Sequence, residues 1–322
     1  MTHILSVMDR PVVIAFCFVV VLLILGGTYN QQFLSALYLL QQLRVASFLG
    51  IIASGAMVVI LLGHIDLSIP WVVTIGGITA TAVAGWWGAP WTALGVPLAV
   101  ACGALVGLAN GLGVAFLRIP SMVFTLGMNA VVQGMIVMYT GGNAPPDQAT
   151  PILQWLAVRD TLYVPHAVIV WALVGVLMVV ALNRTPFGRY VYAIGNTERV
   201  TYLSGINTHR ILIIAFVVSG TCSAFAGAML AGYAGKAYQA MGDPYLLPAI
   251  AAVVLGGTSI LGGRGNYLGT VAGVILITLL ESILSVMQIS DSAREIIYGT
   301  MIIMMMLVYG RDRRLEGSGN LV

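Results

Sequence analysis

Long apolar runs follow one another along the whole chain, and most are close to the length that crosses a bilayer. A membrane-spanning helix needs about 20 predominantly apolar residues. The pattern predicts ten spans: 12–28, 46–63, 67–85, 92–116, 120–140, 163–183, 210–232, 246–261, 267–287 and 294–310. Gly and Pro interrupt the third and eighth of these runs, which are therefore candidates for broken or re-entrant helices.

Composition agrees with this pattern and excludes a soluble domain. Hydrophobic residues make up 59% of the 322 residues and charged residues only 8%, against roughly 25% charged residues in soluble domains. No long polar stretch indicates a second domain. We therefore expect an all-α polytopic membrane protein with a single transmembrane domain over residues 1–322. Five plus five spans also fits an inverted repeat, which many transporters use.

The 14 Lys and Arg residues are distributed unevenly between the two sides of the predicted bundle. With the N-terminus inside, ten lie on the inner side and four on the outer side, and cytoplasmic loops carry the excess of cations. The inner set is Arg10, Arg118, Arg184, Arg189, Arg199, Arg210, Arg264, Arg311, Arg313 and Arg314, and the outer set is Arg44, Arg159, Lys236 and Arg294. Both termini are therefore predicted to be cytoplasmic, with an inner loop at 184–210 and outer loops at 141–162 and 233–246.

Acidic residues gather on the predicted outer side. They are Asp147, Asp160, Asp243, Asp291 and Glu295. This rim would suit docking of a soluble partner, but simple solvation of the loops explains it equally well.

The sequence contains no G-x-x-x-x-G-K-[ST] loop, which binds nucleotide phosphates in many ATPases. The single lysine, Lys236, is followed by alanine. If transport is driven by ATP, another subunit must hold ATP and Mg²⁺, and no cofactor is expected in this chain. No basic patch with interleaved aromatic residues indicates nucleic-acid binding.

The inner loop contains signals for a short amphipathic helix. Thr197 can cap its start, Glu198 is favourable in its first turn, and Gly205 can end it. Val200 and Leu203 would then share one side. Such a helix would fit a groove in a partner subunit, although an ordinary connecting loop is the alternative interpretation.

The segment 61–70 places a carboxylate among apolar residues at the edge of a span. Because such a charge is costly unless it is paired or hydrated, Asp66 indicates a polar site, a helix cap or a water-lined path. Capping of the following helix is favoured over substrate contact. His64 has no second His, Cys or Glu at metal-ligand spacing, so no metal site is predicted.

The segment 255–270 is rich in glycine, with six in sixteen residues. It indicates close backbone approach or a broken helix and lacks the context of a nucleotide-binding motif. The structural glycines expected here are Gly256, Gly257, Gly262, Gly263 and Gly265. Glu281, in the ninth span, is a second intramembrane carboxylate that needs a partner or water.

Four ordered motifs resemble the permease subunits of bacterial ABC importers for monosaccharides, the ribose, arabinose, xylose and rhamnose group that includes autoinducer-2 permeases. The resemblance covers roughly residues 45–310. The motifs are Ile65-Asp-Leu-Ser68, Arg189-Tyr-Val-Tyr-Ala-Ile-Gly195, Leu203-Ser-Gly-Ile206, and Ala249-Ile-Ala-Ala-Val-Val-Leu-Gly-Gly-Thr-Ser259 with Gly262-Gly-Arg-Gly265.

This resemblance implies a dimer of permeases, two cytoplasmic ATPases and an outside solute-binding protein. It implies that the 197–206 helix couples to the ATPase. The coupling residues are then Thr197, Glu198, Arg199, Val200, Leu203, Ser204 and Gly205. The sequence departs from the family pattern at two places. Glu198-Arg-Val stands where the family usually has Glu-Ala-Ala, and His64 and Pro70 flank Ile-Asp-Leu-Ser-Ile where the family often has glycines. Because of these departures, the permease dimer could be a homodimer or a heterodimer.

The resulting hypothesis is inward transport of a monosaccharide by alternating access across the bacterial cytoplasmic (inner) membrane. The predicted translocation path contains Asp66, Ser68, Thr125, Asn129 and Gln133, of which the last three share a helix face. The nearest alternative is an ABC permease of the branched-chain amino-acid type. An autonomous secondary carrier would need more intramembrane carboxylates than Asp66 and Glu281, and a membrane enzyme would need paired catalytic residues, which are not seen.

Overall fold

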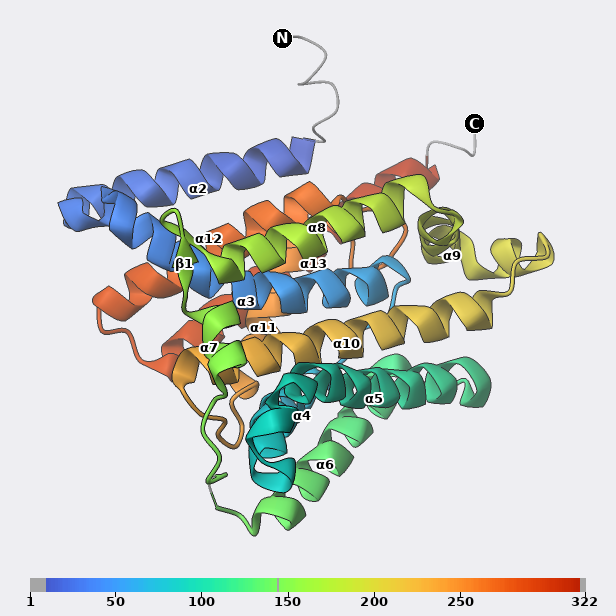
Figure 1. The fold of residues 1–322 in the computed structure, drawn as a ribbon. Coiled ribbons are helices and arrows are strands. Elements are labelled where there is room, and N and C mark those ends of the chain that lie inside the picture. The colour runs from blue at the N-terminus through green and yellow to red at the C-terminus, as the bar shows by residue number, and fades with distance from the viewer. Residues whose placement is uncertain (1–9, 144, 319–322) are drawn as a thin grey trace.

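The computed structural model describes residues 10–143 and 145–318, and most of them are helical (Figure 1). In chain order the helices are α2 (Arg10–Tyr29), η1 (Gln31–Leu34), α3 (Ala36–Leu61), α4 (Ile69–Trp87), η2 (Ala89–Leu94), α5 (Gly95–Leu117), α6 (Ser121–Thr140), α7 (Pro151–Ala157), α8 (His166–Arg184), α9 (Pro186–Leu203), α10 (Thr208–Ala234), η3 (Asp243–Tyr245), α11 (Leu246–Leu255), α12 (Tyr267–Val286) and α13 (Asp291–Ser318). Strands β1 (Asp160–Thr161) and β2 (Val164–Pro165) pair antiparallel in a small hairpin.

Seven helices among the described residues are long and apolar enough to cross a membrane: α3, α4, α5 with the turn before it, α6, α8, α10 and α12. Shorter apolar helices cover Val12–Thr28 and Asp243–Leu255, and α13 follows the last of the seven. Each of the ten predicted spans therefore coincides with a helix, and the fold is an all-α bundle of about ten spans.

Two predicted spans have different bounds in the structure. Helix α3 begins at Ala36, about three turns before the predicted 46–63. Arg44 does not lie in a loop as predicted, because it is buried inside the bundle as part of this helix. The predicted 246–261 span is helical only to Leu255. The glycines that follow take positive φ angles, at Gly257, Gly262 and Gly263, which a helix does not accommodate.

The predicted break in the third span is wrong. Helix α4 is continuous from Ile69, and Pro70 lies in its first turn, where a missing backbone N–H leaves no helical hydrogen bond unmade.

The two long loops also hold more structure than expected. The outer segment 141–162 contains α7 and β1, and most of 184–210 belongs to α9.

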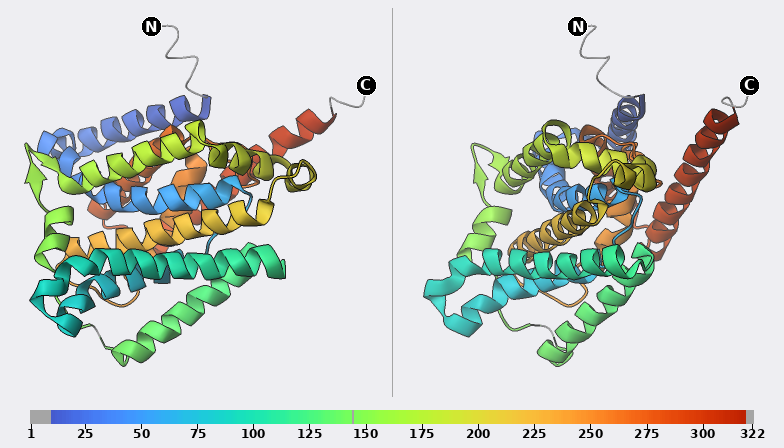
Figure 2. Two further views of the ribbon diagram at one scale, coloured as in Figure 1. Left: turned by 45° about the vertical axis from the view of Figure 1, so that its right-hand side comes forward. Right: turned by 90° about the vertical axis from the view of Figure 1, so that its right-hand side faces the viewer.

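The core lies where α3, α4 and α10 pack together. In its most apolar window α3 is 89% buried, whereas α5 and α6 are each only 22% buried. Glycines bring α5 and α10 very close, since a Cβ on Gly103 would clash with the carbonyl of Gly220, and the reverse is also true. Small residues at such crossings let helix backbones approach in membranes. Figure 2 shows α6 and α13 at the edges of the bundle.

The helices run roughly side by side, so the bundle has two ends. The beginning of α2, helix α9 and the last turns of α13 lie together at one end, here named the α9 end (Figure 1). Helix α7 and the β1–β2 hairpin lie at the opposite end, here named the hairpin end. The first described turns of α2 and the last described turns of α13 thus lie at the same end. The termini themselves are outside the described residues, and their placement in the cytoplasm stays a prediction.

Candidate functional site

Asp66 lies in the connection between α3 and α4 and is 3% exposed. One carboxylate oxygen accepts hydrogen bonds from the backbone N–H and the hydroxyl of Ser68, at 3.0 and 2.6 Å. The other accepts from the hydroxyl of Ser219 on α10, at 2.7 Å. Burial raises the pKa of the Asp66 carboxyl, and the three donors only partly oppose this effect. The predicted cap of α4 by Asp66 is wrong, because Ser68 is the N-cap and has no side-chain cap bond. Asp66 instead closes the turn before α4 and ties that turn to α10.

One further polar side chain extends this cluster. Asn110, fully buried in α5, donates from Nδ2 to the hydroxyl oxygen of Ser68 at 2.8 Å. Neither Asn110 nor Ser219 was singled out by the sequence reasoning. An isolated amide within an apolar run was a usable signal for Asn110, whereas a serine among small residues gave none.

Helix α6 supports the same connection through two of its predicted path residues. The hydroxyl oxygen of Thr125 accepts from the backbone N–H of Leu67 at 2.9 Å, and the Asn129 side-chain oxygen lies 3.4 Å from the N–H of Trp71. Gln133, farther along the helix, is exposed. The structure thus gathers Asp66, Ser68, Thr125 and Asn129 around the start of α4, and Gln133 lies outside this group. Their contact with a transported solute stays a prediction.

The predicted coupling helix is the second half of α9. Thr197 breaks α9 with extended backbone angles (φ −158°, ψ 96°), as expected of a residue before a new helix. At the other end Gly205 has a φ of +83°, and the N–H of Ser204 bonds to the carbonyl of Val200 at 3.0 Å. Residues 198–203 therefore form a separate short helix that ends in a left-handed glycine.

This short helix exposes apolar side chains at the α9 end of the bundle. Val200 is 60%, Tyr202 61% and Leu203 76% exposed, whereas Thr201 is buried. Glu198, Arg199 and Ser204 are also exposed. A helix with one side packed against the protein and exposed apolar residues on the other side has the properties of a protein-docking element.

The glycine-rich segment joins this helix to the core. The N–H of Gly263 donates to the carbonyl of Leu61, the last residue of α3, at 2.9 Å. A Cβ on Gly262 would lie 3.0 Å from the carbonyl oxygen of Gly195 in α9, and one on Gly195 would clash with the carbonyl of Leu61. Tyr192 of α9 donates its hydroxyl to the carbonyl of Gly265 at 2.9 Å.

The remaining predicted glycines have separate roles. A Cβ on Gly256 would clash with the Gly269 carbonyl in α12, and one on Gly265 would lie 2.7 Å from the hydroxyl of Thr258. Gly257 has a φ of +92° in the turn after α11. The glycine-rich segment is therefore a close-packed backbone contact among α3, α9, α11 and α12, as predicted from its composition.

His64 lies between the Asp66 turn and the coupling helix. Burial lowers the pKa of its imidazole, and the nearby carboxylate of Glu198 raises it by a smaller amount. Its ring stacks obliquely against Phe216, with centroids 6.4 Å apart. No group of three or more potential metal-ligating side chains occurs within the described ranges.

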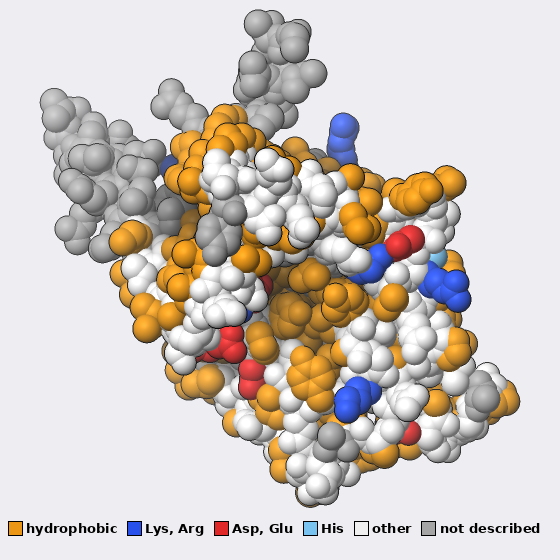
Figure 3. Space-filling view, turned by 90° about the vertical axis from the view of Figure 1, so that its left-hand side faces the viewer, with side chains coloured by type: hydrophobic (Ala, Val, Ile, Leu, Met, Phe, Trp, Pro, Cys, Tyr) orange, Lys and Arg blue, Asp and Glu red, His pale blue; other side chains and the backbone are white. Residues whose placement is uncertain are grey.

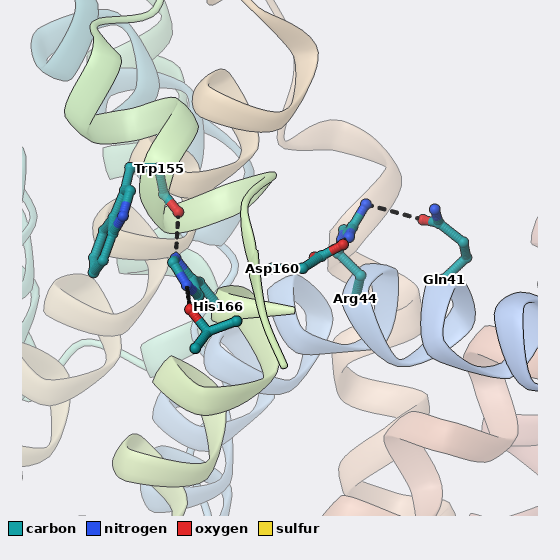
Figure 4. Close-up of polar contacts among 6 residues, drawn as sticks. Gln41, Arg44, Trp155, Asp160 and His166 are labelled. Atoms are coloured by element: carbon teal, nitrogen blue, oxygen red, sulfur yellow. Dashed lines mark hydrogen bonds and ion pairs between the residues drawn. The ribbon is translucent and has the colours of Figure 1, made fainter. Parts of the chain in front are cut away.

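The hairpin end contains a second polar group that the sequence did not predict (Figure 4). Arg44, 8% exposed on α3, pairs with Asp160 of β1 and donates to Gln41 at 3.2 Å. His166, at the start of α8, bonds through its two ring nitrogens to Thr161 and to the carbonyl of Trp155, at 2.6 and 2.8 Å. These contacts fix the hairpin to α3 and α7.

Figure 3 shows the hairpin end as a rim of polar and charged side chains around a hollow lined by hydrophobic ones. Of the predicted acidic rim, Asp160, Asp243, Asp291 and Glu295 are exposed and Asp147 is half-buried. Cations are mixed among them, since Arg294 pairs with Asp291 at 3.3 Å. This end therefore carries charges of both signs and is not uniformly acidic.

A bundle of apolar helices long enough to cross a bilayer defines a polytopic membrane protein. Comparison with known proteins makes the class specific. Residues 38–306 match the family described as branched-chain amino acid transport system / permease component, so the chain belongs to this family of transporter permeases. As a permease it is a multi-pass membrane subunit and not an enzyme.

Three relatives illustrate the range of the family. The chain is 34% identical to the ribose import permease of Bacillus subtilis over 293 residues, which cover 89% of both proteins. It is 32% identical to the autoinducer 2 import system permease of Escherichia coli over 303 residues, 92% of this chain and 85% of the relative. It is 31% identical to the fructose import permease of Rhizobium meliloti over 288 residues, 87% of this chain and 78% of the relative. No solved structure matches the chain.

Proposed function

We propose that this chain is the permease subunit of an ABC importer that moves a monosaccharide inward across the bacterial cytoplasmic membrane. The observation that carries the proposal is the exposed helix 198–203, which meets the end of α3 through the glycine-rich segment. Because a separate ATPase must supply the energy, a rigid element that transmits its motion to the spans is required. The relatives named for ribose, autoinducer 2 and fructose support a sugar-like solute.

Each end of the bundle has a proposed partner. At the α9 end, taken as cytoplasmic, the apolar side chains of Val200 and Leu203 would enter a groove of the ATPase, which would hold ATP and Mg²⁺. At the hairpin end, taken as outer, the charged rim and its hollow would receive a solute-binding protein. A second permease copy, identical or not, would complete the path.

Alternating access then follows from the contacts in this chain. Movement of helix 198–203 would displace Gly195 against the Leu61 carbonyl and so shift the end of α3. The Asp66 turn follows α3 within a few residues, so its hydrogen bonds to Ser68 and Ser219 would transmit the displacement to α4 and α10. Because specificity can reside in the solute-binding protein, this chain needs few direct contacts to the sugar.

The test is uptake by proteoliposomes that contain this permease, its ATPase and its binding protein. Uptake of labelled monosaccharides and of labelled branched-chain amino acids is measured with ATP supplied either inside or outside the proteoliposomes. We expect uptake of a monosaccharide that requires ATP on the side of helix 198–203. Uptake of leucine or valine in place of every sugar would contradict the proposal in favour of the amino-acid alternative.

A further inference from the structure

A cavity of about 540 Å³ opens at the α9 end beside the coupling helix. Its walls come from four separate parts of the chain: the α3–α4 connection, the α5–α6 turn, helix 198–203 and the first turns of α10. The charged or titratable side chains that line it are His64, Arg118, Glu198, Arg199 and His209. Tyr202 and Thr208 belong to the same lining. Several residues with polar side chains thus surround one open space.

The charge balance in this cavity is positive. The lining contains two arginines, Arg118 and Arg199, and one carboxylate, Glu198. The two histidines add ring nitrogens that can donate hydrogen bonds. Arginine presents a planar fork of N–H groups that fits phosphate oxygens, and its charge persists at all working pH values. Basic pockets between helices on the cytoplasmic side of membrane proteins bind anionic lipid head groups by the same chemistry.

Arg118 occupies an unusual backbone position in this lining. It ends α5 with a φ of +54°, in the left-handed region. Glycine is the usual residue at such a helix end because a side chain there is strained. Because strained backbone often occurs at ligand sites, this conformation at the edge of a cavity supports a hypothesis of a binding role for Arg118.

We propose that this cavity binds a phosphate-bearing ligand, with Arg118 and Arg199 as its principal contacts. The volume exceeds that of a phosphate group alone and falls in the usual range of small-molecule sites, so the ligand carries a further polar portion. An anionic phospholipid head group and a soluble phosphate ester share this chemistry. The ligand would bridge helix 198–203 and the ends of α5 and α10.

Such a bridge would also affect coupling between the ATPase and the spans, an inference that rests on the proposed function. A ligand held by Arg199 on the coupling helix and by Arg118 on the spans would restrain their relative movement. Binding itself is measurable without transport, so failure of the site and failure of the transport proposal are distinguishable.

The experiment measures the thermal unfolding midpoint of the purified full-length chain in detergent. In the first arm inorganic phosphate is added in increasing concentration, and sodium chloride at matched ionic strength is the control. In the second arm short-chain phosphatidylglycerol is added, and phosphatidylcholine is the control. We expect saturable stabilisation in at least one arm. A shift with phosphate identifies a soluble ligand, and a shift with phosphatidylglycerol alone identifies a head group.

Variants then assign the shift to this cavity. Arg118→Gly relieves the left-handed strain and is expected to fold, while Arg199→Gln keeps a polar side chain. Each should weaken the apparent affinity about tenfold, as loss of one charge-assisted contact implies. Glu198→Gln should strengthen it, because the single carboxylate is removed. Arg210→Gln, exposed at the same end but outside the lining, is the matched control.

Two results would overturn the proposal. The first is no saturable stabilisation with either probe. The second is stabilisation that Arg118→Gly and Arg199→Gln leave at the wild-type affinity, since binding would then take place elsewhere on the protein.

Discussion

The backbone N–H of Gly263 donates to the carbonyl of Leu61 at 2.9 Å, so the glycine-rich segment is fixed to the last residue of α3. Gly195 of α9 lies against the same carbonyl so closely that a Cβ there would clash with it. Leu61 therefore contacts both the segment that follows α11 and the helix that leads into 198–203. Under the proposed mechanism, motion of the coupling helix would reach the core at this point.

Replacement of Gly195 by alanine tests this contact. The added methyl group would meet backbone on α3 and on the glycine-rich segment, and backbone cannot move aside as a flexible side chain can. Overpacking of this kind costs about 1–3 kcal/mol. We expect a lower thermal unfolding midpoint and a loss of ATP-driven uptake larger than the loss of folded protein.

Gly134→Ala is the matched control for that substitution. Gly134 also lies in a helix, but nothing is within 4 Å of the position its Cβ would take. Alanine is favoured over glycine in helix interiors by about 1 kcal/mol, so this variant should unfold at the same or a higher temperature. Equal loss of stability in both variants would show that the Leu61 contact has no special importance.

Asp66 supports a second prediction, made by a pair of substitutions. Asp66→Ala removes the acceptor for Ser68 and Ser219, and hydrogen bonds to charged groups contribute about 1.5–3 kcal/mol each. Asp66→Asn keeps one oxygen for Ser68, and the Ser219 hydroxyl can rotate to accept from the amide. We expect a large fall in the free energy of unfolding for alanine and a small one for asparagine, measured by denaturant titration in detergent.

A double-mutant cycle between Asp66 and Ser219 isolates the contact between the α3–α4 connection and α10. Residues that share a hydrogen bond show an interaction free energy of about 0.5–3 kcal/mol. Additive effects of Asp66→Ala and Ser219→Ala would contradict a direct bond between the two side chains.

The sequence predicted much of this arrangement because its strongest signals are local. Long apolar runs defined the spans, a carboxylate among apolar residues identified Asp66, and Thr197 with Gly205 defined the ends of the short helix. Dense glycines indicated close backbone contact, although which elements met there was not readable from the chain.

What the sequence did not predict depends on partners far apart in the chain. Arg44 appeared to belong to an outer loop, because a cation near a span end is ordinarily solvated. In the structure Asp160 pairs with it and permits its burial, so α3 begins earlier than predicted. Ser219 likewise gains its role only from Asp66, 153 residues away.

The exposed apolar side chains of the coupling helix lead to a third prediction. Leu203→Asp should abolish co-purification with the ATPase, because an aspartate would be desolvated in the groove without a partner. Leu203 is 76% exposed in the isolated chain, so the unfolding temperature of the permease alone should not fall. Val200→Asp should act in the same direction.

The control for these substitutions is Leu162→Asp. Leu162 is 88% exposed at the tip of the hairpin, on the opposite end of the bundle. It should retain the ATPase at the wild-type level. ATPase retention by Leu203→Asp, or its loss from Leu162→Asp, would be inconsistent with docking at helix 198–203.

His64 gives a pH prediction. Burial lowers the pKa of its imidazole below the usual 6.5, and Glu198 only partly opposes this effect. The folded state therefore favours the neutral ring, and the unfolded chain binds more protons just below pH 6.5. The stabilisation is present above pH 6.5 and is lost as the pH falls toward the folded pKa.

The measurement compares unfolding midpoints between pH 8 and 5.5 for the wild type and His64→Gln. The wild type should lose more stability on acidification than the variant. Arg118, Glu198, Arg199 and His209 line the same cavity, and their contribution is common to both proteins. A wild-type pH dependence that His64→Gln reproduces in full would exclude His64 as its source.

The most direct test of the central claim, a permease driven by a separate ATPase, is uptake under two isolated driving forces. Proteoliposomes with the permease, ATPase and binding protein receive either ATP without an ion gradient or proton and sodium gradients without ATP. We predict monosaccharide uptake with ATP alone, abolished by Leu203→Asp. Uptake driven by an ion gradient, with no response to ATP, would contradict the account.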